Sequence, residues 1–315
     1  MFALQKKISN FKEIKTMKSK NLFLLLMSRT LLVFVFAAFV ACGGGENKDD
    51  KKEDTTAQSS EVKESLQKVL TDVPKPSEMP YQLKATGADF MPKLPNAPAN
   101  VEKYKTTNNK AALNLGVFST DVGYVSVYEQ VQNALDYIKS ATELADKVGV
   151  SSAFDPKVKE RFEKNLKNLD TLTKIINESL ATSDKYLKDN ERNNIAALIF
   201  TGTFMEGLYI ATQIVDSYPD DILPKDAKNE VLMGLVRIIT EQDKPLGELL
   251  KALNSLEKDK DITELTTKLE ELQKLYKALN VKEKIEKNQG NLILTDETIK
   301  GITEKVKEIR TWIVS

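Results

Sequence analysis

The stretch NIAALIFTGTFMEGLYIATQIVD, residues 194–216, decides the fold. Apolar side chains point in most directions around it, as expected of a helix at the centre of a protein. Its length also matches a membrane span. We favour the buried helix because residues 195–215 contain two glycines and five polar or charged residues, namely Thr201, Thr203, Glu206, Thr212 and Gln213.

Apolar residues at three- and four-residue intervals continue on both sides of this stretch. One helix is predicted over residues 109–148, ending at Gly149. Prolines or capping residues mark where further helices begin: Asp155-Pro156, Pro224, Asp261 and Thr295. No comparable β alternation is present, so the sequence predicts an all-α protein. We expect an antiparallel helical bundle or stacked helical hairpins of six to seven helices, forming one domain over residues 109–315.

Composition excludes several classes of chemistry. The chain has 315 residues, no histidine and one cysteine, which removes histidine general bases, Ser-His-Asp triads, zinc knuckles and intrachain disulfides. We therefore predict no metal site, no cofactor and no catalytic residues. Residues 42–315 carry 39 basic and 45 acidic side chains, a balance of −6. Nucleic acid is not an expected partner, because its binding requires a basic face.

The single cysteine follows an apolar run in LLVFVFAAFVACGGG, residues 31–45. A basic region, a short apolar core and small residues before Cys42 are the layout of a secretory signal. The segment Phe39-Val40-Ala41-Cys42 resembles the bacterial lipobox, with Phe39 where leucine is usual. That resemblance implies a signal peptide over residues 1–41, starting at Met1, Met17 or Met27, and a lipidated Cys42. An uncleaved membrane anchor is the alternative, in which Arg29 would lie near mid-span.

Two segments separate Cys42 from the helical domain. Residues 42–72 are glycine-led, acidic and lysine-rich, and we expect a flexible tether. Residues 73–108 contain six prolines and several apolar side chains, which predicts an extended arm that packs on the body. Gly43 is typical of outer-membrane lipoproteins. The Lys48-Asp49-Asp50 cluster resembles a surface-export signal, and both the periplasmic face and the cell surface remain open.

Six residues on two helices are candidates for ligand binding: Asp121, Tyr124, Tyr128, Glu206, Tyr209 and Gln213. Asp121 lies on an apolar stripe, and Glu206 is the only charge between Asn194 and Asp216. A buried carboxyl group requires a partner. The two acids could share a pocket, or tyrosine hydroxyls, Thr203 or Arg192 could satisfy them inside a core. We favour the second interpretation.

The signal region together with LNLGVFSTDVGYVSVYEQ, residues 113–130, and ALDYIKSATELADKVGV, residues 134–150, resembles a group of uncharacterised all-helical Bacteroidota lipoproteins. The resemblance supplies no catalytic residues. We expect a lipid-anchored outer-membrane protein that acts as a non-enzymatic binding or assembly module. Its partners would be the membrane, through the lipid, and other envelope proteins or a small ligand.

Two alternative functions are kept. The first is a carboxylate-dependent hydrolase, which an Asp121–Glu206 separation of about 5 to 10 Å around an open cleft would indicate. The second is an inert structural or adhesive surface lipoprotein. An exposed apolar groove without a sizeable pocket would favour that role over ligand binding.

Overall fold

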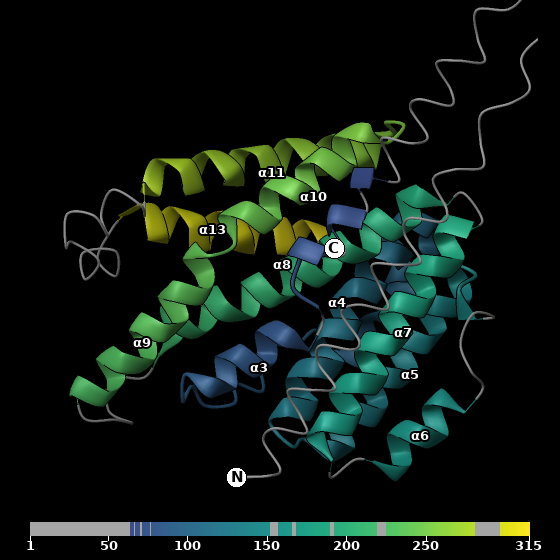
Figure 1. Ribbon diagram of the computed structural model, residues 1–315, viewed down its shortest axis with the longest axis horizontal. Helices are drawn as coiled ribbons and strands as arrows, with labels where there is room; N and C mark the ends of the chain where they lie inside the picture. The colour runs from purple at the N-terminus through teal and green to yellow at the C-terminus, as the bar shows by residue number, and fades with distance from the viewer. Residues whose placement is uncertain are drawn as a thin grey trace, which may run out of the picture. The chain divides into compact units, whose positions relative to one another are not determined.

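The computed structural model describes residues 64–65, 67–69, 71–75, 77–151, 157–165, 168–189, 192–218, 225–280 and 297–315. These residues form helices and contain no strand, which confirms the all-α class (Figure 1). The signal peptide, Cys42, most of the tether, Asp155-Pro156, Pro224 and Thr295 lie outside the described residues. The bounded elements are α3 (Glu78–Ala85), the 3₁₀-helix η1 (Pro98–Thr106), α4 (Asn108–Val127), α5 (Val131–Lys147), α6 (Val158–Lys164), α7 (Leu169–Asp189), α8 (Asn193–Ser217), α9 (Lys225–Thr240), α10 (Asp243–Ser255), α11 (Lys260–Leu279) and α13 (Glu297–Ile313).

Helix α8 is the central element, as predicted from its all-round apolar sequence. It contacts α3, α4, α7, α9, α10 and α13. From Ile195 to Ile214 every residue except Tyr209 is buried. Within the described part of the chain, α8 alone is long and apolar enough to cross a membrane, and 94% of that window is buried inside the protein. The burial explains the hydropathy of α8 without a membrane.

Helices α4 and α8 make the closest contact in the core. A methyl group added to Gly116 of α4 would overlap the backbone of Ile199 and Thr203 of α8. A methyl group on Gly202 would overlap the Leu113 carbonyl in the same way. The Thr120 hydroxyl also donates to the Thr203 carbonyl, at 3.1 Å. The two backbones are therefore in contact, and this contact offsets the low helix propensity of glycine.

The region predicted as one helix over 109–148 contains two helices. Helix α4 ends at Val127, Glu129 takes a left-handed conformation with φ of 60°, and α5 begins at Val131 and packs on α4. No proline or glycine marks this turn, and the apolar spacing continues across it. Gly149, with φ of 70°, ends α5 as predicted. This break and the short helices α3 and α6 raise the number of helices above the predicted six to seven.

The arm is less extended than predicted, because two of its prolines begin helices. Pro80 lies in the first turn of α3 and Pro98 is the first residue of η1, positions where the missing proline N–H is not needed. Residues Met79, Pro80 and Leu83 of α3 are buried, and α3 packs on α4, α8 and α9. The arm is thus part of the folded body.

The C-terminal helices form a group around α11. Helices α10, α11 and α13 lie side by side, and α13 also packs on α8 (Figure 1). The predicted N-cap Asp261 is wrong: Asp259 caps α11 by accepting a hydrogen bond from the Ile262 N–H at 2.8 Å. Helix α9 ends at Thr240 and α10 begins at Asp243, with Pro245 in its first turn. This arrangement brings the last turn of α13 to the middle of α8.

Candidate functional site

Asp121 and Glu206 meet in the core between α4 and α8. Both side chains are 0% exposed. The last turn of α13 supplies their cation: Arg310 Nε lies 3.0 Å from Glu206 Oε2, and Arg310 Nη2 lies 3.1 Å from Oε1. This fork-to-fork geometry is the strongest form of ion pair. Neither Thr203 nor Arg192, which the sequence suggested as partners, takes that place.

The surroundings of the Asp121 carboxyl group favour its protonated form. Burial raises its pKa well above the ordinary aspartate value, and the nearby Glu206 charge raises it further. Its Oδ2 accepts the Asn96 N–H at 3.1 Å, whereas Oδ1 has no donor among the described residues. In its protonated form this carboxyl group can donate a hydrogen bond. The cluster therefore combines the Glu206–Arg310 ion pair with a second carboxyl group whose neutral form is favoured.

Arg310 also contacts an aromatic ring. Its guanidinium lies 4.6 Å from the centre of the Tyr209 ring, a cation–π contact. Burial alone disfavours the charged guanidinium, but the Glu206 carboxylate outweighs it and raises the pKa of Arg310. The Arg310 side chain is 13% exposed. The cluster is therefore an ion pair inside the protein with almost no contact with solvent.

The arm is fastened to the cluster through Asn96. The Asn96 side-chain amide donates to the Tyr104 hydroxyl at 3.0 Å, and that hydroxyl lies 3.3 Å from the Val314 carbonyl beyond α13. Together with the Asn96 N–H on Asp121, these bonds connect the arm, α4 and the chain's C-terminal residues. The network joins segments that are far apart in sequence.

Tyr124 and Tyr128 hold the arm and do not face Glu206. Their rings lie 5.0 Å apart, and Phe90 of the arm packs 5.2 Å from the Tyr124 ring. The Tyr124 hydroxyl accepts the Met91 N–H at 2.9 Å, and the Tyr128 hydroxyl donates to the Ala88 carbonyl at 2.8 Å. Burial raises the pKa of Tyr124 to about 12, so its hydroxyl stays neutral.

Gln213 lies apart from the other candidates. It is seven residues beyond Glu206 on α8, about 10 Å along the helix axis. Its side chain is buried, and Nε2 has no acceptor among the described residues. The six predicted residues thus divide into Asp121, Glu206 and Tyr209 around Arg310, the arm-binding pair Tyr124 and Tyr128, and Gln213 alone.

Sequence reasoning missed Arg310, Asn96 and Tyr104. A signal existed for Arg310, since it lies four residues after Val306 and three before Ile313 and so borders the buried stripe of α13. Asn96 and Tyr104 come from the proline-rich arm, where no periodicity predicts which side chains turn inward. Only the folded chain brings them to Asp121.

The carboxyl pair has the geometry of a structural core cluster. Both acids are fully buried, and neither is among the residues that line the two described cavities. Acid–base work at a glycosidic bond needs an open cleft around the two acids. Within the described ranges, no three acidic or sulfur side chains gather as metal ligands.

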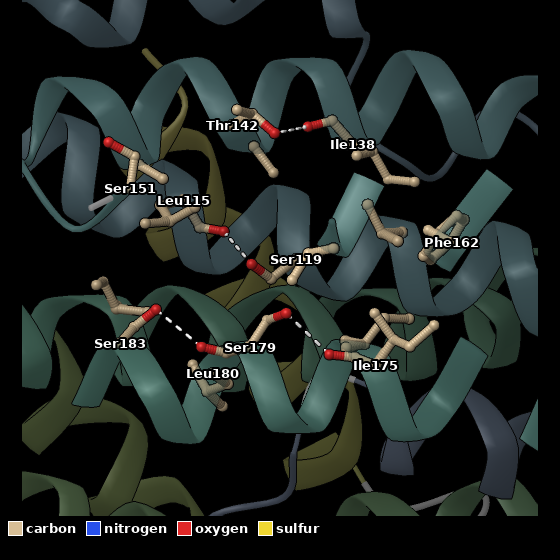
Figure 2. Close-up of a pocket in the computed structure, with 16 residues that line it drawn as sticks. Leu115, Ser119, Ile138, Thr142, Ser151, Phe162, Ile175, Ser179, Leu180 and Ser183 are labelled. Atoms are coloured by element: carbon tan, nitrogen blue, oxygen red, sulfur yellow. Dashed lines mark hydrogen bonds between the residues drawn. The ribbon is translucent and has the colours of Figure 1, made fainter. Parts of the chain in front are cut away.

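A separate cavity of about 530 Å³ lies between α4, α5, α6 and α7. In Figure 2, α5 and α7 form opposite walls with α4 between them; Phe162 lies at one end, and Ser151 and Ser183 lie toward the other. None of the sixteen lining residues is charged. Most are aliphatic, and Phe162 is the one aromatic residue among them. No candidate residue predicted from the sequence lines this cavity.

Four of the five hydroxyl groups that line the cavity are directed to their own helices. Ser119, Thr142, Ser179 and Ser183 each donate to the carbonyl four residues earlier, at 2.7 to 2.9 Å (Figure 2). Each hydroxyl therefore uses its only proton inside the protein. The wall that remains offers a ligand mainly dispersion contacts and removal of apolar surface from water.

Fold and site define an all-α protein with a buried ionic cluster and an apolar cavity between four helices. Comparison of the chain with protein-family models, curated proteins and solved structures finds no match. The functional argument therefore depends on the chain's own chemistry.

Proposed function

We propose that the mature protein is a lipid-anchored protein of the cell envelope that binds a mainly apolar ligand without transforming it. The cavity between α4, α5, α6 and α7 carries the proposal. Its volume of about 530 Å³ lies within the range of about 300–1,000 Å³ found for small-molecule sites. Protein interiors contain few voids larger than one water molecule, so a space of this size is not ordinary packing.

The two alternatives receive less support from the geometry. A hydrolase using Asp121 and Glu206 requires solvent and substrate to reach both acids, and both are fully buried beside Arg310. An inert or adhesive role requires no internal cavity. The cavity lining contains no charged residue, and four of its five hydroxyl groups already donate to backbone carbonyls, which suits it to binding. Without a charged residue, the lining has no base that could activate a nucleophile.

The location is proposed from the sequence. A lipid on Cys42 would anchor the protein in the outer membrane, on the periplasmic face or the cell surface, and the tether would separate the helical body from the bilayer. Growth with an alkyne-tagged fatty acid tests this: label is expected on the wild-type chain and absent from Cys42→Ser. Wild-type protein without label, still carrying residues 1–41 by mass spectrometry, would refute the anchoring.

The binding proposal is tested on residues 42–315 with Cys42→Ser, purified without detergent. The described core begins at Val69, inside the segment predicted as a tether, so the predicted tether contributes at least this residue to the core and is kept in the test protein. The neutral fluorescent probe N-phenyl-1-naphthylamine is expected to bind at one equivalent. Ser179→Phe, which fills the cavity, should abolish binding, whereas Thr182→Phe should not.

Thr182 is a matched control because it lies on the same helix, its hydroxyl makes the same bond to the carbonyl four residues earlier, and it is exposed outside the cavity. Far-UV circular dichroism verifies that both variants fold. Absence of probe binding to the parent chain, or equal binding to the folded Ser179→Phe chain, would exclude the cavity as a ligand site.

A further inference from the structure

The cavity has the shape and lining of a site for a linear hydrocarbon chain. Its lining residues on α7 extend from Ile175 to Ser183, which are eight helical steps or about 12 Å apart. If each carbon of a chain occupies about the 30 Å³ of one liquid water, the volume holds on the order of sixteen carbons. Aliphatic walls with a single aromatic residue favour a flexible chain over a flat ring system.

Arg192 does not line the cavity, but it lies near its Ser151 end. Gly149 is two residues before Ser151, and a side chain added there would meet Arg192 Nη1 at 3.3 Å. Arg192 is partly buried, and its guanidinium has no hydrogen-bond or ion-pair partner among the described residues. A guanidinium carries five N–H groups that can bind an anion.

Other charges near this end do not compensate Arg192. On α7, Asp184 and Lys188 follow Ser183, and they pair with each other at 3.0 Å. At the opposite end, Arg161 is adjacent to Phe162 but is already bound to Glu178 at 3.1 Å. Arg192 is therefore the arginine left to bind the polar end of a ligand whose chain occupies the cavity.

We propose that the ligand is a single-chain carboxylate amphiphile, with its hydrocarbon chain between α4, α5 and α7 and its carboxylate bound by Arg192. This inference depends on the proposed function, because it names the ligand class of the same cavity. It assigns Arg192 the role of head-group anchor, which the sequence alone did not indicate. A guanidinium fork matches a carboxylate with two parallel hydrogen bonds.

The test compares palmitate with 1-hexadecanol, which share a sixteen-carbon chain and differ in head group. Both are titrated into residues 42–315 with Cys42→Ser, and binding is measured by displacement of N-phenyl-1-naphthylamine. Palmitate is expected to bind about tenfold or more tightly, since one charge-assisted contact accounts for a factor of that size. Arg192→Gln should remove this preference and leave hexadecanol binding unchanged.

Arg161→Gln is the matched control, because it removes the arginine at the other end of the cavity. Equal binding of palmitate and hexadecanol to the parent chain, or loss of the preference in Arg161→Gln and not in Arg192→Gln, would overturn the head-group assignment while the cavity remains a binding site. Failure of the probe and both amphiphiles to bind would instead overturn the proposed function itself. Circular dichroism again verifies folding of each variant.

Discussion

Asp121→Asn is predicted to stabilise the protein at pH 7 and to destabilise it slightly at pH 4. Burial and the Glu206 charge raise the pKa of Asp121 well above its ordinary value. In the unfolded chain the pKa is about 3.9. Between these two pH values the folded state keeps a proton that the unfolded state releases. Folding must take up that proton, so the wild-type protein loses stability as pH rises through this window.

The size of the effect follows from proton linkage. Each pH unit above the unfolded pKa costs about 1.4 kcal/mol while the folded carboxyl stays protonated. At pH 7, about three units above that pKa, the cost reaches at most about 4 kcal/mol. Asparagine carries its hydrogens at every pH, donates to Glu206 and still accepts the Asn96 N–H. Its second amide hydrogen has no acceptor there, which costs about 1–2 kcal/mol. The expected net gain is about 1–3 kcal/mol at pH 7.

Urea unfolding followed by far-UV circular dichroism from pH 4 to pH 8 measures this gain. Taking the difference between wild type and variant cancels the titration of all other groups. Asp136→Asn, an exposed acid on α5, is the control for loss of a surface charge. The reasoning is refuted if Asp121→Asn is several kcal/mol less stable than wild type at pH 7 with a difference independent of pH, as an ionised Asp121 would require.

Three further outcomes follow from the same contacts. Arg310→Met leaves the Glu206 charge buried without its partner and should lower the free energy of unfolding in urea by about 3–5 kcal/mol. A second substitution, Glu206→Gln, should recover most of that loss, and no recovery would mean that the buried charge is not the cause. Gly116→Ala should lower the free energy of unfolding by about 3 kcal/mol because the α4 and α8 backbones must separate. Gly247→Ala, where the nearest atom to the added methyl group lies 3.7 Å away, should raise it by up to about 1 kcal/mol. Equal effects of the two substitutions would contradict the close approach of α4 and α8. Tyr128→Phe removes the bond to the Ala88 carbonyl and should cost about 1 kcal/mol and speed hydrogen exchange in the arm, which unchanged exchange rates would disprove.

The sequence predicted the helices whose ends are marked by residue type, and it missed those set by tertiary contacts. Gly149 ends α5 as expected because only a residue tolerant of positive φ fits that position easily. Glu129 takes a positive φ without any such mark. The turn there is stabilised by the return of α5 onto α4, which no local pattern encodes. A continuous apolar stripe therefore concealed two helices.

The sequence predicted the two buried acids of the candidate site but not their partner. A lone charge in an apolar stretch is visible in sequence, so Glu206 and Asp121 could be named, and their need for partners followed from desolvation. The identity of the partner was not visible, because Arg310 lies 104 residues beyond Glu206. The cavity could not be predicted at all, since aliphatic residues that line a cavity and those that fill a core have the same spacing.

Helix α4 explains how the ionic cluster and the cavity occur in one body. Sixteen of its residues are buried, so each of its faces is covered by a different neighbour. Gly116 and Thr120 face α8, Asp121 and Tyr124 face the cluster and the arm, and Leu115 belongs to the face that lines the cavity. The backbone contact with α8 holds α4 on one side. The ion pair of Glu206 and Arg310 lies beside Asp121 of the same helix. The cavity wall that α4 supplies is therefore supported by contacts on the other faces of the same helix.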